Sequence, residues 1–228
     1  CIRDRDIPYI QEGLSIKTGA DTLFSEFLQT GLLYVQTASS MIPAKVLGPD
    51  AGDHVLDMCA APGSKTTHIA ALMGNRGSID AWDVYPHKVK LIKDNAKRLG
   101  ISIIHTEVRD SVKPLPFLYE TYDKVLLDAP CSGLGVLGHK VELRWRRKES
   151  DLSVFPPLQK QLIEQAAKYT KTGGVLVYST CTLNPDENEH IINEFLSLHS
   201  EFAPEEFNFP VLGKSLNLSL IHISEPHE

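Results

Sequence analysis

The chain has 228 residues, of which 42% are apolar and 23% are charged, and its formal net charge is −6 at pH 7. This composition favours one large globular domain, alone or with an appendage, and excludes a disordered chain. No apolar run reaches the roughly 18 residues that a membrane-spanning helix needs, and the first residues lack the pattern of a signal peptide. We therefore expect a cytoplasmic protein that does not bind a membrane. The acidic balance argues against binding of nucleic acid over the whole surface, but it permits a local basic patch.

The four cysteines are Cys1, Cys59, Cys131 and Cys181. They lie far apart in the sequence, none forms a C-x-x-C pair, and no histidine stands near them at the spacing of a zinc finger. This pattern disfavours both a disulfide framework and a metal site. We therefore expect free thiols and no bound metal.

Residues 1–50 hold short apolar pieces and one expected helix, which includes Ala38 and ends near Gly48. We interpret them as a lead-in segment, because the chain opens on Cys1 and enters a turn-rich stretch, as though a preceding domain were missing. At the other end, residues 216–228 follow no clear period. We expect residues 206–228 to form a tail that does not belong to the fold.

From Asp53 onward, short apolar runs alternate with glycine-bearing turns and helical stretches. The expected strands cover residues 54–58, 78–82, 101–105, 123–127 and 175–178, and the expected helices cover residues 63–73, 86–99 and 157–170. A last helix is predicted after Asn184, which suits the N-cap, with Pro185 at the first helical position and the acids at 186 and 187 complementing the dipole. Strands that alternate with helices predict an α/β fold with a doubly wound, mostly parallel sheet over residues 51–205.

Two of the cysteines come just past expected strands. Cys131 follows the apolar residues 125–127 by a short run that begins at Asp128, and Cys181 follows the apolar residues 175–178. In a parallel sheet, ligands bind beyond the carboxyl ends of the strands, so the two thiols are expected to share one site. A single cysteine is more often a small buried apolar residue, but two thiols at one site favour covalent chemistry on a bound base.

A turn rich in small residues follows the first of these strands and opens the next helix. Its members are Cys59, Ala60, Ala61, Pro62, Gly63, Ser64 and Lys65. At such a turn, the backbone N–H groups of the helix start meet a nucleotide-like ligand. The turn is neither G-x-G-x-x-G nor a P-loop, since Ser64 separates Gly63 from Lys65. The competing interpretation is an ordinary Gly/Pro turn.

Two acids lie where a ribose would bind. Asp83 ends the second of these strands, where a carboxylate accepts hydrogen bonds from ribose hydroxyls. Asp110 follows the third strand and is expected to line the same pocket. For both residues, the alternative is a solvated carboxylate at the end of a strand.

One basic cluster follows the turn at residues 133–138. It contains Lys140, Arg144, Trp145, Arg146, Arg147 and Lys148. Cationic side chains that contact phosphates, together with an aromatic ring that stacks on a base, suit a single-stranded or flipped-out nucleic acid. A solvated charged surface is the alternative.

Together these motifs resemble the RNA cytosine-C5 methyltransferases of the Sun/Fmu family. The resemblance covers residues 20–205 and rests on the turn at residues 57–66 and the runs at residues 128–131 and 179–182. The helix at residues 91–100 and the turn at residues 133–138 are most similar to the RsmB branch, which modifies a cytosine of bacterial 16S ribosomal RNA. The resemblance implies a Rossmann-like class I methyltransferase fold, S-adenosylmethionine as the cofactor and 16S ribosomal RNA as the partner. We also expect a monomer.

The family's functional residues are carried over where this sequence matches. The turn at residues 59–65, Asp83, Asp110 and Asp128 would contact S-adenosylmethionine, Cys181 would be the nucleophile, and Cys131 would assist product release. Two features depart from the family: Thr37 follows Gln36 where an Asp is usual, and no strand is visible after the last helix. Members also carry a helical RNA-binding domain before the catalytic one. The lead-in is therefore expected to be the end of a linker from such a domain.

Cytosine chemistry gives independent reasons for these residue types. C5 of cytosine is too weak a nucleophile to take a methyl group from a sulfonium, whereas addition of a thiolate at C6 makes C5 enamine-like. The C5 proton must then leave before the thiol is eliminated, and a second acid or base nearby assists that step. Asp128 is expected to hold the N3/N4 edge of the base, and Lys65 is expected to favour the thiolate. A structural Lys65–Asp128 ion pair would explain both residues equally well.

Other functions stay open at this point. A DNA cytosine methyltransferase would use Cys131 as the nucleophile. A non-catalytic RNA-binding relic would not need both thiols, and a small-molecule or protein methyltransferase would not need two cysteines after strands. Within RNA, a tRNA is the alternative target.

Overall fold

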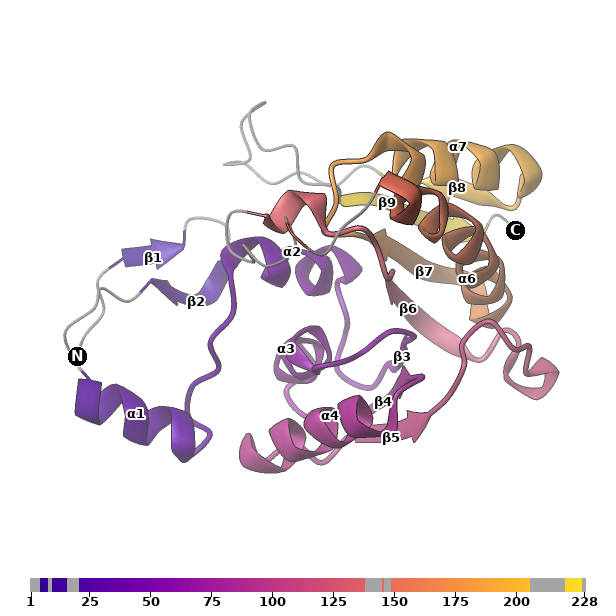
Figure 1. Ribbon diagram of the computed structural model, residues 1–228. Coiled ribbons are helices and arrows are strands. Elements are labelled where there is room, and N and C mark those ends of the chain that lie inside the picture. Colours follow the sequence, from indigo (N-terminus) through magenta and orange to yellow (C-terminus); the bar gives the residue numbers. More distant parts are fainter. Residues whose placement is uncertain are drawn as a thin grey trace.

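The computed structural model describes residues 5–7, 10–15, 21–137, 145, 149–205 and 220–226, and its central feature is a seven-stranded sheet (Figure 1). The strand order is β5-β4-β3-β6-β7-β9-β8. The strands are β3 (His54–Asp57), β4 (Ser78–Asp83), β5 (Ile104–Val108), β6 (Tyr122–Asp128), β7 (Thr170–Ser179), β8 (Phe202–Pro204) and β9 (Leu220–Pro226). β3 to β7 pair in parallel, and β9 pairs antiparallel with β7 and β8. The predicted doubly wound, mostly parallel sheet is confirmed.

Both faces of this sheet are buried. Val55 of β3 and Leu126 of β6 pack in one apolar cluster, while their chain neighbours Leu56 and Leu127 pack in another on the opposite face. Successive side chains of a strand point to opposite faces, so a strand covered on both sides needs apolar residues at every position. This requirement explains why the sequence shows continuous apolar runs rather than alternation.

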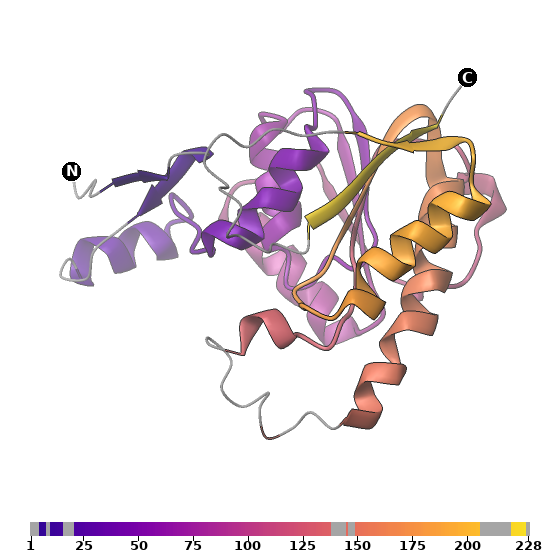
Figure 2. The ribbon, with the colours of Figure 1, turned by 90° about the horizontal axis from the view of Figure 1, so that it is seen from above.

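Helices cover the two faces separately (Figures 1 and 2). On one side lie α2 (Ala38–Leu47), α3 (Ser64–Leu72) and α4 (Pro86–Arg98), and on the other lie α6 (Phe155–Tyr169) and α7 (Glu189–Leu198). The short 3-10 helices are η1 (Pro116–Leu118), η2 (Leu134–Val136), η3 (Glu149–Ser153) and η4 (Pro185–Glu187). Within the described ranges, no helix combines the length and apolar character needed to cross a membrane.

The third strand of the alternating pattern begins later than predicted. β5 starts at Ile104, because the backbone just before it is already hydrogen-bonded elsewhere. The Ile101 N–H donates to the Ala96 carbonyl at 2.9 Å, and the Ser102 N–H donates to Asn75 Oδ1 at 3.0 Å. Residues 101 and 102 therefore connect the helix to the sheet, and the Ile103 carbonyl makes the first bond to β4, accepting from the Ile79 N–H at 2.8 Å.

The last helix also begins later than predicted. Asn184 does act as an N-cap, because its side chain accepts a hydrogen bond from the Asp186 N–H at 3.2 Å, and Pro185 takes the first position. The turn that it caps is η4, however, and α7 begins only at Glu189. Glu187 turns inward and is fully buried, which the sequence pattern did not predict.

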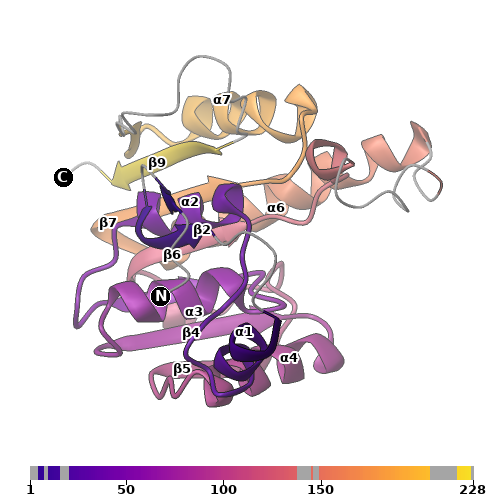
Figure 3. The ribbon, with the colours of Figure 1, turned by 90° about the vertical axis from the view of Figure 1, so that its left-hand side faces the viewer.

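The first fifty residues divide into two parts. β1 (Arg5–Ile7), β2 (Ile10–Ser15) and α1 (Asp21–Gln29) lie beside the central sheet, and α1 comes close to the end of α4 (Figures 1 and 3). Arg98 holds that contact, since its Nη1 donates to the Leu28 carbonyl at 2.6 Å. By contrast, Ala44 and Leu47 of α2 belong to the core. α2, which was expected to belong to the lead-in, is therefore packed on the sheet.

Two strands follow α7, although no strand after the last helix was visible in the sequence. β8 continues the chain after α7, and β9 lies within the expected tail, between β7 and β8 in the sheet. Residues 206–219, between these strands, lie outside the described part of the chain. The sequence pattern missed β8 and β9 because each is short or lacks an alternating apolar period.

Candidate active site

The two strand-end cysteines lie side by side. Cys131 follows β6 and Cys181 follows β7, and these adjacent parallel strands pair with Asp128 opposite Ser179. The Sγ–Sγ distance is 3.2 Å, and the Cys181 N–H donates to Cys131 Sγ at 3.3 Å. The prediction that the two thiols share one site is confirmed.

The two thiols differ in exposure and in protonation. Cys181 is exposed, whereas Cys131 is half-buried. The hydrogen bond to Cys181 and burial together raise the pKa of Cys131 far above its usual value. The raised pKa keeps Cys131 protonated, and either sulfur can be the donor in the contact between Cys131 Sγ and Cys181 Sγ. The sulfur of Cys181 is thus the more accessible of the two.

A buried ion pair lies close to the thiols. Lys65 Nζ is 2.6 Å from Asp128 Oδ2, and the Ser179 hydroxyl donates to Asp128 Oδ1 at 2.7 Å. Burial by itself would lower the pKa of Lys65, but the charge and the hydrogen bond of Asp128 raise it above its usual value. The charge of Cys181 contributes to the same increase. Lys65 is therefore cationic at neutral pH, and its expected role in favouring a thiolate at Cys181 stays a prediction.

The turn at residues 59–65 is held tightly against its neighbours. The Ala60 N–H donates to the Trp82 carbonyl at 2.8 Å, and the Gly63 N–H donates to the Ala60 carbonyl at 2.7 Å. Gly63 has φ of +100°, and a Cβ at this position would lie 3.1 Å from Cα of Ile92 in α4. Only glycine combines this backbone angle with such close packing. α3 begins directly afterwards, so its first N–H groups have no acceptor within the helix.

The acids of the expected cofactor site lie around this turn. Burial is the largest cause of the raised pKa of Cys59, and the charges of Asp57, Asp128 and Asp83 raise it further. Burial raises the pKa of Asp57 itself to about 7, although its carboxylate accepts a hydrogen bond from Thr66 at 2.7 Å. Asp83 ends β4, as predicted, and accepts a hydrogen bond from the Tyr85 N–H at 3.0 Å.

Asp110 lies on the turn that follows the carboxyl end of β5. It accepts a hydrogen bond from the Val112 N–H at 3.3 Å, and the adjacent Ser111 hydroxyl donates to the Met58 carbonyl at 2.7 Å. The donor set fits S-adenosylmethionine: free N–H groups at the start of α3 suit its carboxylate, and Asp83 suits its ribose hydroxyls. Asp110, by its position, can complete the pocket.

The turn that leads to the basic cluster packs on Cys181. The Gly135 N–H donates to the Cys181 carbonyl at 3.0 Å, and a Cβ on Gly135 would lie only 2.8 Å from that oxygen. Trp145 is 87% exposed, as a stacking residue would be. The cationic members of the predicted cluster, Lys140, Arg144, Arg146, Arg147 and Lys148, lie outside the described residues.

A buried polar network beneath the cysteines was not predicted. Its centre is Glu187, which is 0% exposed, and Gln159 of α6 is equally buried. Ser132 and Thr182, each next to one of the cysteines, share a hydrogen bond of 2.7 Å between their hydroxyls. No sequence signal identifies these residues, because acids and amides after a strand usually face solvent.

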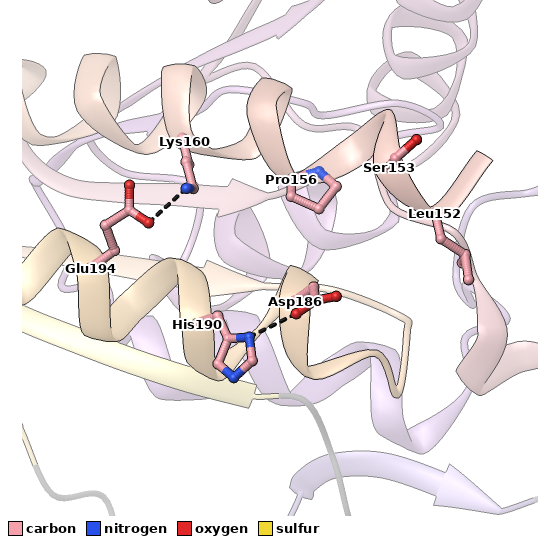
Figure 4. Close-up of a pocket in the computed structure, with 7 residues that line it drawn as sticks. All are labelled: Leu152, Ser153, Pro156, Lys160, Asp186, His190 and Glu194. Carbon is pink, nitrogen blue, oxygen red and sulfur yellow. Dashed lines mark hydrogen bonds and ion pairs between the residues drawn. The ribbon is translucent and has the colours of Figure 1, made fainter. Parts of the chain in front are cut away.

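One groove of about 610 Å³ lies between α6 and the start of α7, and none of the expected site residues lines it. Its lining residues are Leu152, Ser153, Pro156, Lys160, Asp186, His190 and Glu194 (Figure 4). The charged side chains are paired with each other, His190 with Asp186 at 2.7 Å and Lys160 with Glu194 at 2.6 Å. In the described part of the chain, no three His, Cys, Asp or Glu side chains are grouped so as to hold a metal ion.

Known proteins share this sequence and this architecture. The chain is 43% identical over 182 residues to "Probable ribosomal RNA small subunit methyltransferase B" of Bacillus subtilis, a match that covers 79% of this chain and 41% of that protein. It is 43% identical over 169 residues to the human "tRNA (cytosine(72)-C(5))-methyltransferase NSUN6", covering 69% of this chain and 35% of that protein. The chain spans less than half the length of the curated relatives that it matches.

A solved structure described as "The crystal structure of NSun6 from Pyrococcus horikoshii with SFG" superimposes with a TM-score of 0.73 at 36% identity. The match covers 87% of this chain and 53% of that one. The architecture is the Rossmann-like class I methyltransferase fold, as expected. The profile of the family described as "16S rRNA methyltransferase RsmB/F" matches residues 44–219. The chain belongs to this RsmB/F family of RNA methyltransferases.

Proposed function

We propose that this chain transfers a methyl group from S-adenosylmethionine to C5 of a cytosine in 16S ribosomal RNA, through a covalent bond between Cys181 and C6 of the base. The observation that carries the proposal is the pair of thiols 3.2 Å apart beside the turn at residues 59–65. Two thiols in contact at the carboxyl edge of a methyltransferase sheet serve a reaction that forms and then breaks a bond to the base. Methylation of a small molecule or a protein has no need of them.

Cys181 is the nucleophile in this proposal. Its sulfur is exposed, and the cationic Lys65 favours its thiolate. The thiolate adds to C6 of the cytosine, which moves electron density onto C5. S-adenosylmethionine supplies the electrophilic methyl group. Asp128 supports the base at its N3/N4 edge, since Lys65 and Ser179 fix the orientation of its carboxylate.

Cys131 is suited to the last step because its pKa depends on Cys181. The hydrogen bond to Cys181 is the largest cause of its raised pKa. Once the sulfur of Cys181 is bonded to C6, it carries no negative charge and accepts hydrogen bonds only weakly. The pKa of Cys131 then falls, so the thiol releases its proton to solvent and the resulting thiolate takes the C5 proton. The electron pair re-forms the C5–C6 double bond, and Cys181 leaves as a thiolate.

The choice of RNA rests on the relatives. The matching family is described as a family of 16S ribosomal RNA methyltransferases. The Bacillus subtilis relative is named as a ribosomal RNA methyltransferase, and the human relative is named as a methyltransferase of cytosine C5 in a tRNA. The Pyrococcus structure contains SFG, an analogue of S-adenosylmethionine. We therefore propose 16S ribosomal RNA as the substrate and the cytoplasm as the place of action.

The test combines product analysis with an adduct assay. 16S ribosomal RNA is incubated with the protein and methyl-labelled S-adenosylmethionine, digested, and analysed for 5-methylcytidine by mass spectrometry. Cys181→Ala should form neither product nor adduct, whereas Cys131→Ala should stall with RNA bonded to Cys181 and give a slow band on a denaturing gel. An adduct in Cys181→Ala that is missing in Cys131→Ala would falsify the assignment and favour attack by Cys131.

A further inference from the structure

A fully buried carboxylate lies beneath the two cysteines. Glu187 of η4 is 0% exposed, and both of its carboxylate oxygens accept hydrogen bonds. Oε2 accepts from the Ser132 N–H at 2.8 Å and from Gln159 Nε2 at 3.1 Å, and Oε1 accepts from Asn184 Nδ2 at 3.1 Å. All three donors are neutral groups.

These donors come from three separate segments of the chain. Ser132 stands next to Cys131 on the loop after β6, and Asn184 lies on the turn that follows Cys181. Gln159 belongs to α6 and also donates to the Pro130 carbonyl at 2.9 Å, on the other side of Cys131. The carboxylate therefore ties the loop of one cysteine to the loop of the other.

The same two loops are joined by further short contacts. The Ser132 and Thr182 hydroxyls are 2.7 Å apart, and the Tyr178 hydroxyl donates to the Glu187 carbonyl at 2.7 Å. Ser132 and Thr182, the chain neighbours of the two cysteines, are thus held in place by hydrogen bonds. The side chains of the cysteines project from two loops that cannot separate without breaking this network.

A fully buried carboxyl group whose partners are all neutral is a costly way to fill the interior. The desolvation of an ionised carboxylate exceeds what neutral partners return, and an apolar side chain of similar volume would often stabilise the fold as well or better. Such groups are retained in some proteins because their hydrogen bonds select one arrangement. Here the arrangement selected is the approach of two loops that carry reactive thiols.

We propose that Glu187 is a positioning residue that holds Cys131 against Cys181. The contribution of Glu187 to catalysis rests on the proposed function, but its effect on the distance between the two cysteines does not. Without the carboxylate, the loop of Cys131 is free to move away from Cys181, so the thiol loses its acceptor and its reach toward the bound base. Removal of the C5 proton should then be impaired, while cofactor binding should not change.

The distance between the thiols can be probed without RNA. Diamide, a diazene, takes two protons and two electrons from a thiol pair and becomes a hydrazine while an S–S bond forms between Cys131 and Cys181. The rate of this closure, followed by mass spectrometry of the linked peptides, reports how often the two sulfurs meet. We expect Glu187→Gln to close at least about tenfold more slowly than the parent, because an amide cannot accept at both ends of the network.

A charge-swapped variant provides the rescue. In the double variant Asn184→Asp with Glu187→Gln, the new carboxylate at 184 accepts from the new amide at 187 and still caps η4. The amide oxygen at 187 remains free to accept from Ser132 and Gln159. Closure should return to within about threefold of the parent rate. Glu189→Gln, which changes an exposed acid two positions later, is the matched control and should close at the parent rate.

The outcomes separate this inference from the proposed function. A folded Glu187→Gln protein that closes at the parent rate overturns the positioning role, whether or not the parent methylates RNA. Slow closure with rescue, in a parent that proves inactive on RNA, keeps the positioning role and rejects the proposed function. If Glu187→Gln does not fold, Asn184→Ala takes its place, since it removes one donor from a half-buried position. Parent-rate closure in Asn184→Ala would then reject the role.

Binding of S-adenosylhomocysteine supplies the internal reference. Calorimetry should give the same affinity for the parent, Glu187→Gln and the double variant, because the turn at residues 59–65 does not contribute to this network. In single-turnover methylation, Glu187→Gln should lower the rate constant and leave the cofactor affinity unchanged. A loss confined to cofactor affinity would contradict the role assigned to Glu187.

Discussion

Replacement of Lys65 by methionine tests the ion pair that lies beside the thiols. The Lys65 and Asp128 side chains are only 17% and 29% exposed, and their charged atoms are 2.6 Å apart. Removing one partner of a buried pair typically costs about 3–5 kcal/mol, because the other charge is left uncompensated. Asp128 keeps the Ser179 hydroxyl and some contact with water, so we reduce the expected loss to about 2 kcal/mol.

The matched control is Lys90→Met on the surface of α4. Lys90 also pairs with an aspartate, Asp94, but the two side chains are 73% and 55% exposed. Exposed pairs contribute roughly 0.2–1 kcal/mol, and salt screens them. Urea denaturation at pH 7 should therefore show a loss for Lys65→Met that is several times larger than for Lys90→Met and that persists at high salt. Equal losses in the two variants would refute the assignment of a buried pair.

The same variant has a chemical consequence. In the proposed mechanism Lys65 is the cation that favours the thiolate of Cys181, and in its absence the negative charge of Asp128 would oppose that thiolate. Alkylation of Cys181 by iodoacetamide at pH 7 should be slower in Lys65→Met than in the parent, while Lys90→Met should react normally. Alkylation at the parent rate would show that Lys65 serves only the fold.

Three further outcomes are expected. Asp83→Ala should weaken binding of S-adenosylmethionine by about tenfold or more in calorimetry, since one charged hydrogen bond contributes about 1.5–3 kcal/mol; unchanged affinity would remove Asp83 from the ribose site. Burial lowers the pKa of His199, but hydrogen bonds to Glu201 and Glu164 raise it above its usual value overall. Protonated His199 therefore stabilises the fold. Its contribution is complete below the unfolded pKa of about 6.5 and is lost as pH rises through the folded pKa, so His199→Gln should cost more stability at pH 5.5 than at pH 9. A cost that does not depend on pH would contradict this. Finally, replacing the arginines at 144, 146 and 147 should flatten the salt dependence of RNA binding. An unchanged slope would show that this cluster is a solvated charged surface that does not contact RNA.

Much of the fold could be predicted from local sequence. The alternation of apolar runs with glycine-bearing turns identified the five parallel strands, and the helices α3 and α4 begin and end within one residue of the predicted limits. The same pattern located Cys131 and Cys181 just past strand ends. Because parallel strands present their carboxyl ends at one edge of the sheet, a shared location of the two thiols could be predicted from their positions just past the strands. Residue type and spacing were sufficient for these features.

Other features depended on contacts that no local pattern contains. The hydrogen bond between Lys65 and Asp128 joins residues 63 positions apart, and the bond between Glu187 and Ser132 joins residues 55 positions apart. Each forms only because β6 lies between β3 and β7 in the sheet. Sequence periodicity records which face of an element is apolar, but it does not record which elements become neighbours. The burial of Glu187, and with it the spacing of the two thiols, was therefore decided by strand order and by the packing of α6 against the sheet.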